Sequence, residues 1–193
     1  LDSEHPDVAV SLNNRAWLCM VQGKFADADP LYVQVTTILE RVHGPDHPAV
    51  ATALSNHADV LLLQEKYEDA DPLYLRAIAI GEKALGPDHP DLAGMLNNRG
   101  ALLLAQGKYA DADPLYLKAT NILERVHGPD HPALATVLIN RAQVLTSQEK
   151  YDEADPLYLR AIKIGENAFG VDHPELTSPL NNRALILDTQ VGV

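Results

Sequence analysis

The chain has 193 residues and carries 27 Asp and Glu against 15 Lys and Arg, a formal net charge of −12. A protein that neutralises nucleic-acid phosphates needs a basic surface, so this balance argues against DNA or RNA as a partner. No apolar stretch approaches the roughly 20 residues of a membrane-spanning helix, so no membrane partner is expected. The single cysteine, Cys19, cannot form an internal disulfide, and no N-x-Ser/Thr sequence is present. Both features favour a cytoplasmic protein.

A His-Pro pair recurs at a constant interval along the chain, at His5, His47, His89, His131 and His173. A period of about 20 to 50 residues indicates stacked copies of one supersecondary unit. We therefore expect one array over residues 1–193, with repeats at 5–46, 47–88, 89–130 and 131–172 and a half repeat at 173–193. Because the half repeat has no second helix and the first residue is not Met, we expect the chain to be part of a longer array.

Each repeat predicts two helices joined by a tight turn, as the copy at 89–130 illustrates. Pro90 opens an apolar run with helical spacing, so His89 is the expected N-cap of a first helix that extends to about residue 106. The Gly107-Lys108 pair breaks this helix, and a second one is expected from 109 to the Gly-Pro pair at 128–129. Pro114 should lie near the first turn of the second helix or just inside it, where we expect at most one lost hydrogen bond and a slight bend.

The turn between the two helices differs between alternate repeats. Glu65 and Glu149 occupy the position that is glycine in repeats one and three. If the turn requires a positive φ at this position, the two glutamates carry a conformational cost there.

Several of these features resemble the tetratricopeptide repeat. They are alanine and tyrosine at fixed offsets in the second helix, a Gly-Lys-Tyr turn and a small residue in the middle of the first helix, namely Ala16, Ala58, Gly100, Ala142 and Ala184. The usual period of that repeat is about 34 residues, and the copies here are longer. The longer second helix and the LNNR, DPLY and GPDHP segments resemble the long variant of kinesin light chains, of nephrocystin-type proteins and of NB-ARC and STAND NTPases. The resemblance covers essentially the whole chain and implies an all-α fold, a right-handed superhelix (solenoid) of antiparallel helix pairs.

Comparison of the copies with one another separates packing positions from changeable ones in the first helix. Leucine is fixed at 12, 54, 96, 138 and 180, so this column should pack. Four columns change chemical character: Asn13, Ser55, Asn97, Ile139, Asn181; Trp17, Asp59, Ala101, Gln143, Leu185; Met20, Leu62, Leu104, Thr146, Asp188; and Val21, Leu63, Ala105, Ser147, Thr189. With about 3.6 residues per turn, these columns fall within an arc of roughly 100° on one face of the helix.

The resemblance implies that this face lines a concave groove, so we predict that it binds a peptide. The alternative is an exposed face that drifts freely. The large apolar residues Trp17, Met20, Leu62 and Leu104 argue against that alternative, because a drifting solvated face would more often carry charges.

A fifth column, Asn14, Asn56, Asn98, Asn140 and Asn182, is unchanged. An Asn amide offers two donors and an acceptor. The resemblance implies that it holds ligand backbone, whereas the alternative is a hydrogen bond between neighbouring first helices. The predicted peptide-binding residues are Asn13, Asn14, Trp17, Met20, Asn56, Asp59, Asn97, Asn98, Asn140, Gln143, Asn181 and Asn182.

The next column is basic, with Arg15, His57, Arg99, Arg141 and Arg183. A buried guanidinium needs an acidic partner. The expected partners are the fixed acids near the start of the second helix, Asp29, Asp71, Asp113 and Asp155. The alternative is that the basic column binds a ligand. His57 should weaken the pair in its repeat.

Catalytic chemistry is not expected. Five of the eight histidines are the repeated His-Pro caps, and the HGPDH segments lie on linkers instead of on one helix face, so no metal site, catalytic residue or cofactor is predicted. Three functions remain. The first is a module that binds a protein or peptide in the groove, the second is the sensing arm of an NB-ARC or STAND NTPase, and the third is a structural array that self-associates end to end through uncapped terminal helices.

Overall fold

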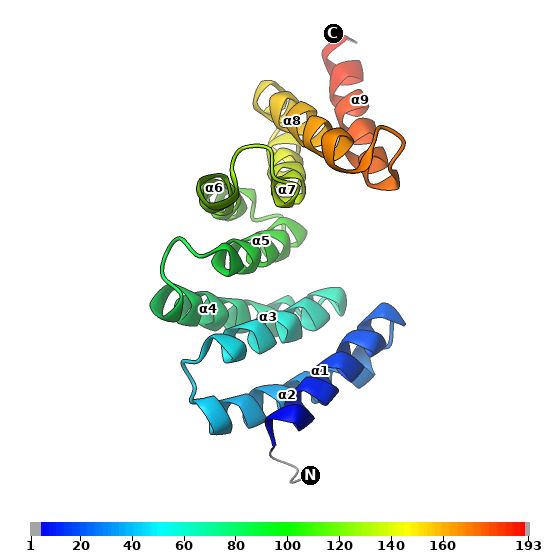
Figure 1. Ribbon diagram of the computed structural model, residues 1–193. Helices are drawn as coiled ribbons and strands as arrows, with labels where there is room; N and C mark the ends of the chain where they lie inside the picture. Colours follow the sequence, from blue (N-terminus) through cyan, green and yellow to red (C-terminus); the bar gives the residue numbers. More distant parts are fainter. Residues whose placement is uncertain (1–4, 192–193) are drawn as a thin grey trace. The chain divides into compact units, whose positions relative to one another are not determined.

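The structure is a computed structural model that describes residues 5–191 (Figure 1). Between these residues every element is helical and no strand is present. The elements are α1 (Pro6–Val21), α2 (Phe25–His43), α3 (Pro48–Leu63), α4 (Tyr67–Ala84), α5 (Pro90–Ala105), α6 (Tyr109–His127), α7 (Ala133–Ser147), α8 (Tyr151–Phe169), the 3-10 turn η1 (Pro174–Leu176) and α9 (Thr177–Val191). Odd-numbered helices are the first helices of the repeats and even-numbered helices are the second.

The chain forms two compact units, residues 1–102 and 103–193. In the first unit α1 packs on α2, α2 on α3 and α3 on α4; in the second, α6 packs on α7, α7 on α8 and α8 on η1 and α9. The turns within each pair are short, so the paired helices are antiparallel (Figure 1). The predicted all-α solenoid of helix pairs is confirmed, and the grouping of all repeats into one array stays a prediction.

The His-Pro pairs start the first helices as predicted. At all five pairs the histidine Nδ1 accepts the backbone N–H two residues on, at 3.2 to 3.4 Å. The proline follows at the first helical position of α1, α3 and α5, whereas α7 begins one residue later, at Ala133, and Pro174 opens η1. Pro114 lies just inside α6, which continues through it, as predicted.

The turn between the paired helices requires a left-handed backbone. Its φ is 71° at Gly23 and 70° at Gly107, and 60° at both Glu65 and Glu149. These are the only non-glycine residues with positive φ between residues 5 and 191. The predicted conformational cost therefore falls on the two glutamates.

The core repeats one arrangement. A small residue of the first helix and a tyrosine of the second meet an aliphatic side chain from the first helix of the next repeat, as in the clusters Ala16, Ala28, Leu31, Tyr32, Val60; Ala58, Leu61, Ala70, Tyr74, Leu102; and Ala142, Leu145, Ala154, Tyr158, Ile186. The fixed leucines 54, 96 and 138 are buried as predicted, whereas Leu180 on α9 is 46% exposed. The column of Val60, Leu102, Val144 and Ile186 is also buried, although the comparison of copies did not single it out.

The basic column pairs with the acids of the preceding second helix. Arg99 donates to Asp71 at 2.9 Å, Arg141 to Asp113 at 2.7 Å and Arg183 to Asp155 at 2.6 Å. The predicted pairing is therefore confirmed. His57 Nε2 lies 2.6 Å from Asp29 Oδ1, so the histidine keeps the contact at equal length.

A second set of arginine contacts recurs in alternate repeats. Arg76 of α4 donates to Glu40 of α2 at 2.6 Å and to the carbonyl of Pro45 at 3.4 Å. Arg160 of α8 contacts Glu124 of α6 at 2.5 Å and the carbonyl of Pro129 at 2.6 Å. Each arginine thus ties an even repeat to the second helix and linker of the odd repeat before it.

Candidate functional site: the recognition face of the first helices

We use the term recognition face for the four changeable columns and the Asn column on the first helices. On α1 this face presents the exposed apolar side chains of Trp17 and Val21, and Trp17 is 58% exposed. Met20 differs from Trp17 because it packs against the core and its sulfur lies 4.0 Å from the Tyr32 hydroxyl. Trp17 is therefore accessible to solvent, whereas Met20 packs against the core beneath it.

The first unit has a hollow of about 290 Å³ between α1, α2 and α3. Asn13 and Asn56 lie on its rim, and the Asn56 amide donates to Asn13 Oδ1 at 3.5 Å. Its remaining lining is small or aliphatic: Ala9, Val10, Val35, Leu39, Ala49, Thr52 and Ala53. The lining of this hollow is therefore mainly apolar.

Asp59 lies at the centre of a hydrogen-bonded group in the first unit. The Tyr74 hydroxyl donates to Asp59 Oδ1 at 2.5 Å, and the Asn98 amide reaches both carboxylate oxygens at 3.1 and 3.2 Å. Asn97 in turn donates to Asn98 Oδ1 at 3.2 Å. Burial raises the pKa of Asp59, and the hydrogen bonds from Tyr74 and Asn98 oppose that rise. Asn98 therefore fixes α5 against α3, which is the alternative role predicted for the Asn column.

The second unit has a hollow of about 360 Å³ on the same face. Its lining is Leu104, Gln143, Thr146, Ser147, Tyr158, Asn182 and Leu185. Five of these seven residues belong to the changeable columns, and Asn182 belongs to the Asn column. Tyr158, from the second helix, forms the floor of the hollow. Burial raises the pKa of the Tyr158 hydroxyl, and hydrogen bonds with Thr146 and Asn182 oppose that rise.

The twelve predicted residues thus lie in different surroundings. Asn13 and Asn56 line the hollow of the first unit, Gln143 and Asn182 line that of the second, and Asn140 lines a further cavity in the second unit. Asn98 is hydrogen-bonded to both Asp59 and Asn97. Asn14, Trp17 and Asn181 are exposed, and Met20 is partly buried.

Sequence comparison missed the part played by the second-helix tyrosines. Tyr32, Tyr74 and Tyr158 place their hydroxyls beneath the recognition face, against Met20, Asp59 and the Thr146–Asn182 pair. The signal was available, because all four repeats have tyrosine instead of phenylalanine at this buried position. A buried hydroxyl needs a hydrogen-bond partner.

Histidines meet at the linkers between repeats. The rings of His43 and His47 stack with centroids 4.5 Å apart, and those of His127 and His131 at 4.4 Å. Among the described residues, no group of three or more His, Cys, Asp or Glu side chains is placed to hold a metal ion. None of the helices described is both long enough and apolar enough to cross a membrane.

The family profile of the tetratricopeptide repeat matches residues 7–83, 50–93, 91–166 and 134–190. The chain belongs to the tetratricopeptide repeat family. This result agrees with the helix pairs, the buried small residue and tyrosine, and the turn that the structure places in every complete repeat.

Solved structures similar to this tetratricopeptide protein include kinesin light chain-like repeats. BtubC (BKLC) from P. vanneervenii is 20% identical with a TM-score of 0.83, and the match covers 95% of this chain and 73% of that chain. A putative kinesin light chain of Podosopora anserina with nearly identical TPR-like repeats is 19% identical with a TM-score of 0.81, covering 97% and 89%. The apo form of RapI is 15% identical with a TM-score of 0.74, covering 94% and 69%. At these identities the likeness concerns the fold, and no curated protein sequence matches the chain.

Proposed function

We propose that this tetratricopeptide protein is a non-enzymatic, cytoplasmic module that binds an extended peptide segment of a partner protein on the recognition face of its first helices. Tetratricopeptide repeats are generally protein–protein interaction modules and non-catalytic scaffolds. The observation that carries the proposal is the hollow of the second unit, because most of its lining comes from the columns that differ between repeats. A surface used only for packing would keep those columns alike.

The chemistry of the face suits a peptide. A hollow of about 360 Å³ with the apolar rim residues Leu104 and Leu185 can receive a side chain, while Gln143 offers both donor and acceptor groups. In the first unit Trp17 supplies an exposed aromatic anchor. The exposed amides of Asn14 and Asn181 can contact a main chain. We expect an affinity around micromolar, or roughly 8 kcal/mol.

Calorimetric titration with peptides selected from a random extended library tests this proposal. Trp17→Ala and Gln143→Ala should each weaken binding by about tenfold, which corresponds to about 1.4 kcal/mol. Leu159→Ala is the matched control, because Leu159 is exposed on α8 beside Tyr158 but does not line the hollow. Trp17 is the only tryptophan, so its fluorescence reports contact on α1 directly. Unchanged binding in both face variants would refute the proposal.

End-to-end self-association is a second candidate, supported by apolar side chains on the outermost helices. Leu18 of α1 is 49% exposed and Leu187 of α9 is 40% exposed, whereas the equivalent Val60 and Leu145 are buried. Sedimentation at increasing protein concentration should then reveal assemblies, and the Leu18→Ser variant should remain monomeric. A mass that stays monomeric throughout would exclude this function.

The sensing arm of an NB-ARC or STAND NTPase remains a prediction from the sequence resemblance. A phosphate-binding loop in a parent chain would support it, and a coiled coil there would favour cargo binding.

A further inference from the structure

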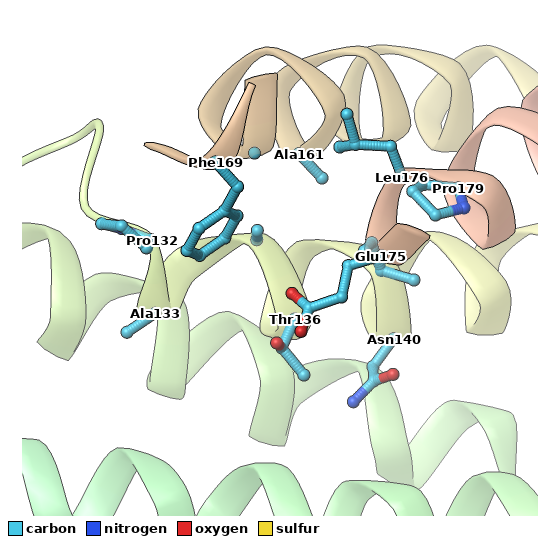
Figure 2. Close-up of a pocket in the computed structure, with 12 residues that line it drawn as sticks. Pro132, Ala133, Thr136, Asn140, Ala161, Phe169, Glu175, Leu176 and Pro179 are labelled. Atoms are coloured by element: carbon cyan, nitrogen blue, oxygen red, sulfur yellow. The ribbon is translucent and has the colours of Figure 1, made fainter. Parts of the chain in front are cut away.

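The second unit contains a larger cavity, of about 410 Å³, between the start of α7, the end of α8 and η1 with α9 (Figure 2). Its walls are mostly apolar and include Ala161, Phe169, Leu176 and Pro179. Thr136 and Asn140 contribute polar groups from α7. Asn140 belongs to the recognition face, so the cavity opens beside that face.

Two side chains give this cavity its chemistry. Figure 2 shows the Phe169 ring and the Glu175 carboxylate both projecting into the space over α7, with the carboxylate beside Thr136. Phe169 is 48% exposed despite its size, and the His173 ring supports it with centroids 4.9 Å apart. Within residues 5–191 the Glu175 carboxylate has no hydrogen bond or ion pair, and only its backbone N–H is bonded, to His173. An acceptor and an aromatic surface therefore face the same space.

The equivalent positions in the first unit lack this combination. In the hollow between α1, α2 and α3, Ala49 takes the place of Glu175, and Leu39 takes the place of Gly165. That hollow is smaller, about 290 Å³, and holds no carboxylate.

Between α3 and α5, a side chain fills the space that corresponds to this cavity. Met95 is buried there and packs so close to Gly81 that a Cβ on Gly81 would lie 3.2 Å from the Met95 sulfur. Asp91 of α5 is the equivalent of Glu175, but it lines none of the cavities described. Among the positions compared, an acidic group and an aromatic ring share a cavity once.

We propose that this cavity binds the side chain of an arginine in the partner segment. The inference rests on the proposed function, because it assumes that the segment lies along the recognition face. It adds the chemical class of the ligand, a peptide with a basic residue. The formal net charge of −12 favours the approach of such a partner.

Arginine fits the cavity better than other side chains. Its planar guanidinium stacks on an aromatic ring, with the cation within about 6 Å of the ring centroid, and pairs with a carboxylate through two parallel hydrogen bonds. Its methylene stem can lie along Ala161 and Leu176, which are apolar. Lysine can meet the carboxylate as a point charge but cannot form the planar, two-bond contact.

The test uses the two phenylalanines of the chain, Phe25 and Phe169, as paired reporters. The full chain is labelled with ring-13C phenylalanine and titrated with N-acetyl-arginine amide. N-acetyl-citrulline amide, which has the same shape without the charge, is the matched ligand. We expect a saturable shift of the Phe169 resonances alone, and a much weaker response to citrulline.

Two variants sharpen the test. Glu175→Gln should weaken arginine binding by at least tenfold, and Asp91→Asn, which removes one charge from the same column, should leave it unchanged. A far-ultraviolet circular dichroism spectrum and a thermal melt that match those of the parent report that the variants remain folded. The inference is overturned if Phe169 responds equally to both ligands or if Glu175→Gln binds as well as the parent.

The two proposals can fail separately. Peptides that depend on Trp17 and Gln143, combined with a silent Phe169, would overturn the arginine site and support the recognition face. A specific arginine shift without any peptide binding that depends on Trp17 or Gln143 would support the cavity and overturn the assumption that a segment lies along that face.

Discussion

Replacing a turn glutamate with glycine should stabilise the protein. Glu65 and Glu149 hold φ at 60°, in the left-handed region. That conformation costs an L-residue about 1 to 2 kcal/mol. Glycine avoids this cost but loses about 0.5 to 1 kcal/mol more conformational entropy on folding. We therefore expect Glu65→Gly to raise the free energy of unfolding by about 0.5 to 1 kcal/mol.

The reverse change gives a control with the opposite sign. Gly107 has a φ of 70°, and a Cβ built on it would meet no atom within 4 Å. Gly107→Ala should therefore cost about 1 kcal/mol through the backbone alone. Gly94 lies inside α5 and also has open space around it. Gly94→Ala should stabilise by about 0.5 to 1 kcal/mol, because a helix interior favours alanine.

Urea unfolding followed by circular dichroism measures all three changes. For a chain of this size, 1 kcal/mol corresponds to a change in Tm of about 2 to 4 °C. If Glu65→Gly destabilised the protein while Gly107→Ala had no effect, the argument from turn geometry would be wrong. The glutamate side chain would then be contributing contacts that outweigh its backbone conformation.

Three further predictions concern charged and capping groups. Arg141→Leu should lower the free energy of unfolding by about 2 kcal/mol, because a charge-assisted hydrogen bond to the partly buried Asp113 is lost; a double-mutant cycle with Asp113→Leu that gives no coupling would contradict this. Burial raises the pKa of Asp59, so its contribution to stability is fully present below the ordinary value of 3.8 and is lost as pH rises through the raised native value. The free energy of unfolding measured across this range should fall less steeply with pH in Asp59→Asn than in the parent, and identical pH profiles would rule the effect out. His47→Ala should cost about 1 kcal/mol through the lost N-cap, whereas His47→Asn should restore most of it, as thermal melting can show.

Local rules predicted much of the fold because each one depends on few residues. The His89-Pro90 pair fixes the start of α5 through one side-chain cap and one restricted φ. The pairing of Arg141 with Asp113 followed from the cost of leaving a guanidinium without an acidic partner. Pro114 was likewise expected near the start of the second helix or just inside it, and α6 continues through it.

The recognition face was harder to predict because side chains of one column meet different neighbours in each repeat. Ser55 is buried, although the equivalent Asn181 is exposed. Met20 joins the core, although Trp17 three residues earlier is exposed. The Asn98 amide donates a hydrogen bond to Asp59, which is the one carboxylate in the neighbouring column. Periodicity places a column on a face, but depth and hydrogen bonding depend on the packed neighbours.

The arginine contacts at Arg76 and Arg160 bear on how such a chain can be lengthened. Each arginine needs a glutamate and a linker carbonyl from the repeat before it. The glutamate is present in every complete repeat, at Glu40, Glu82, Glu124 and Glu166. An added repeat that carries the arginine would therefore find an acceptor after an odd or an even repeat, so a designer could extend this scaffold one repeat at a time.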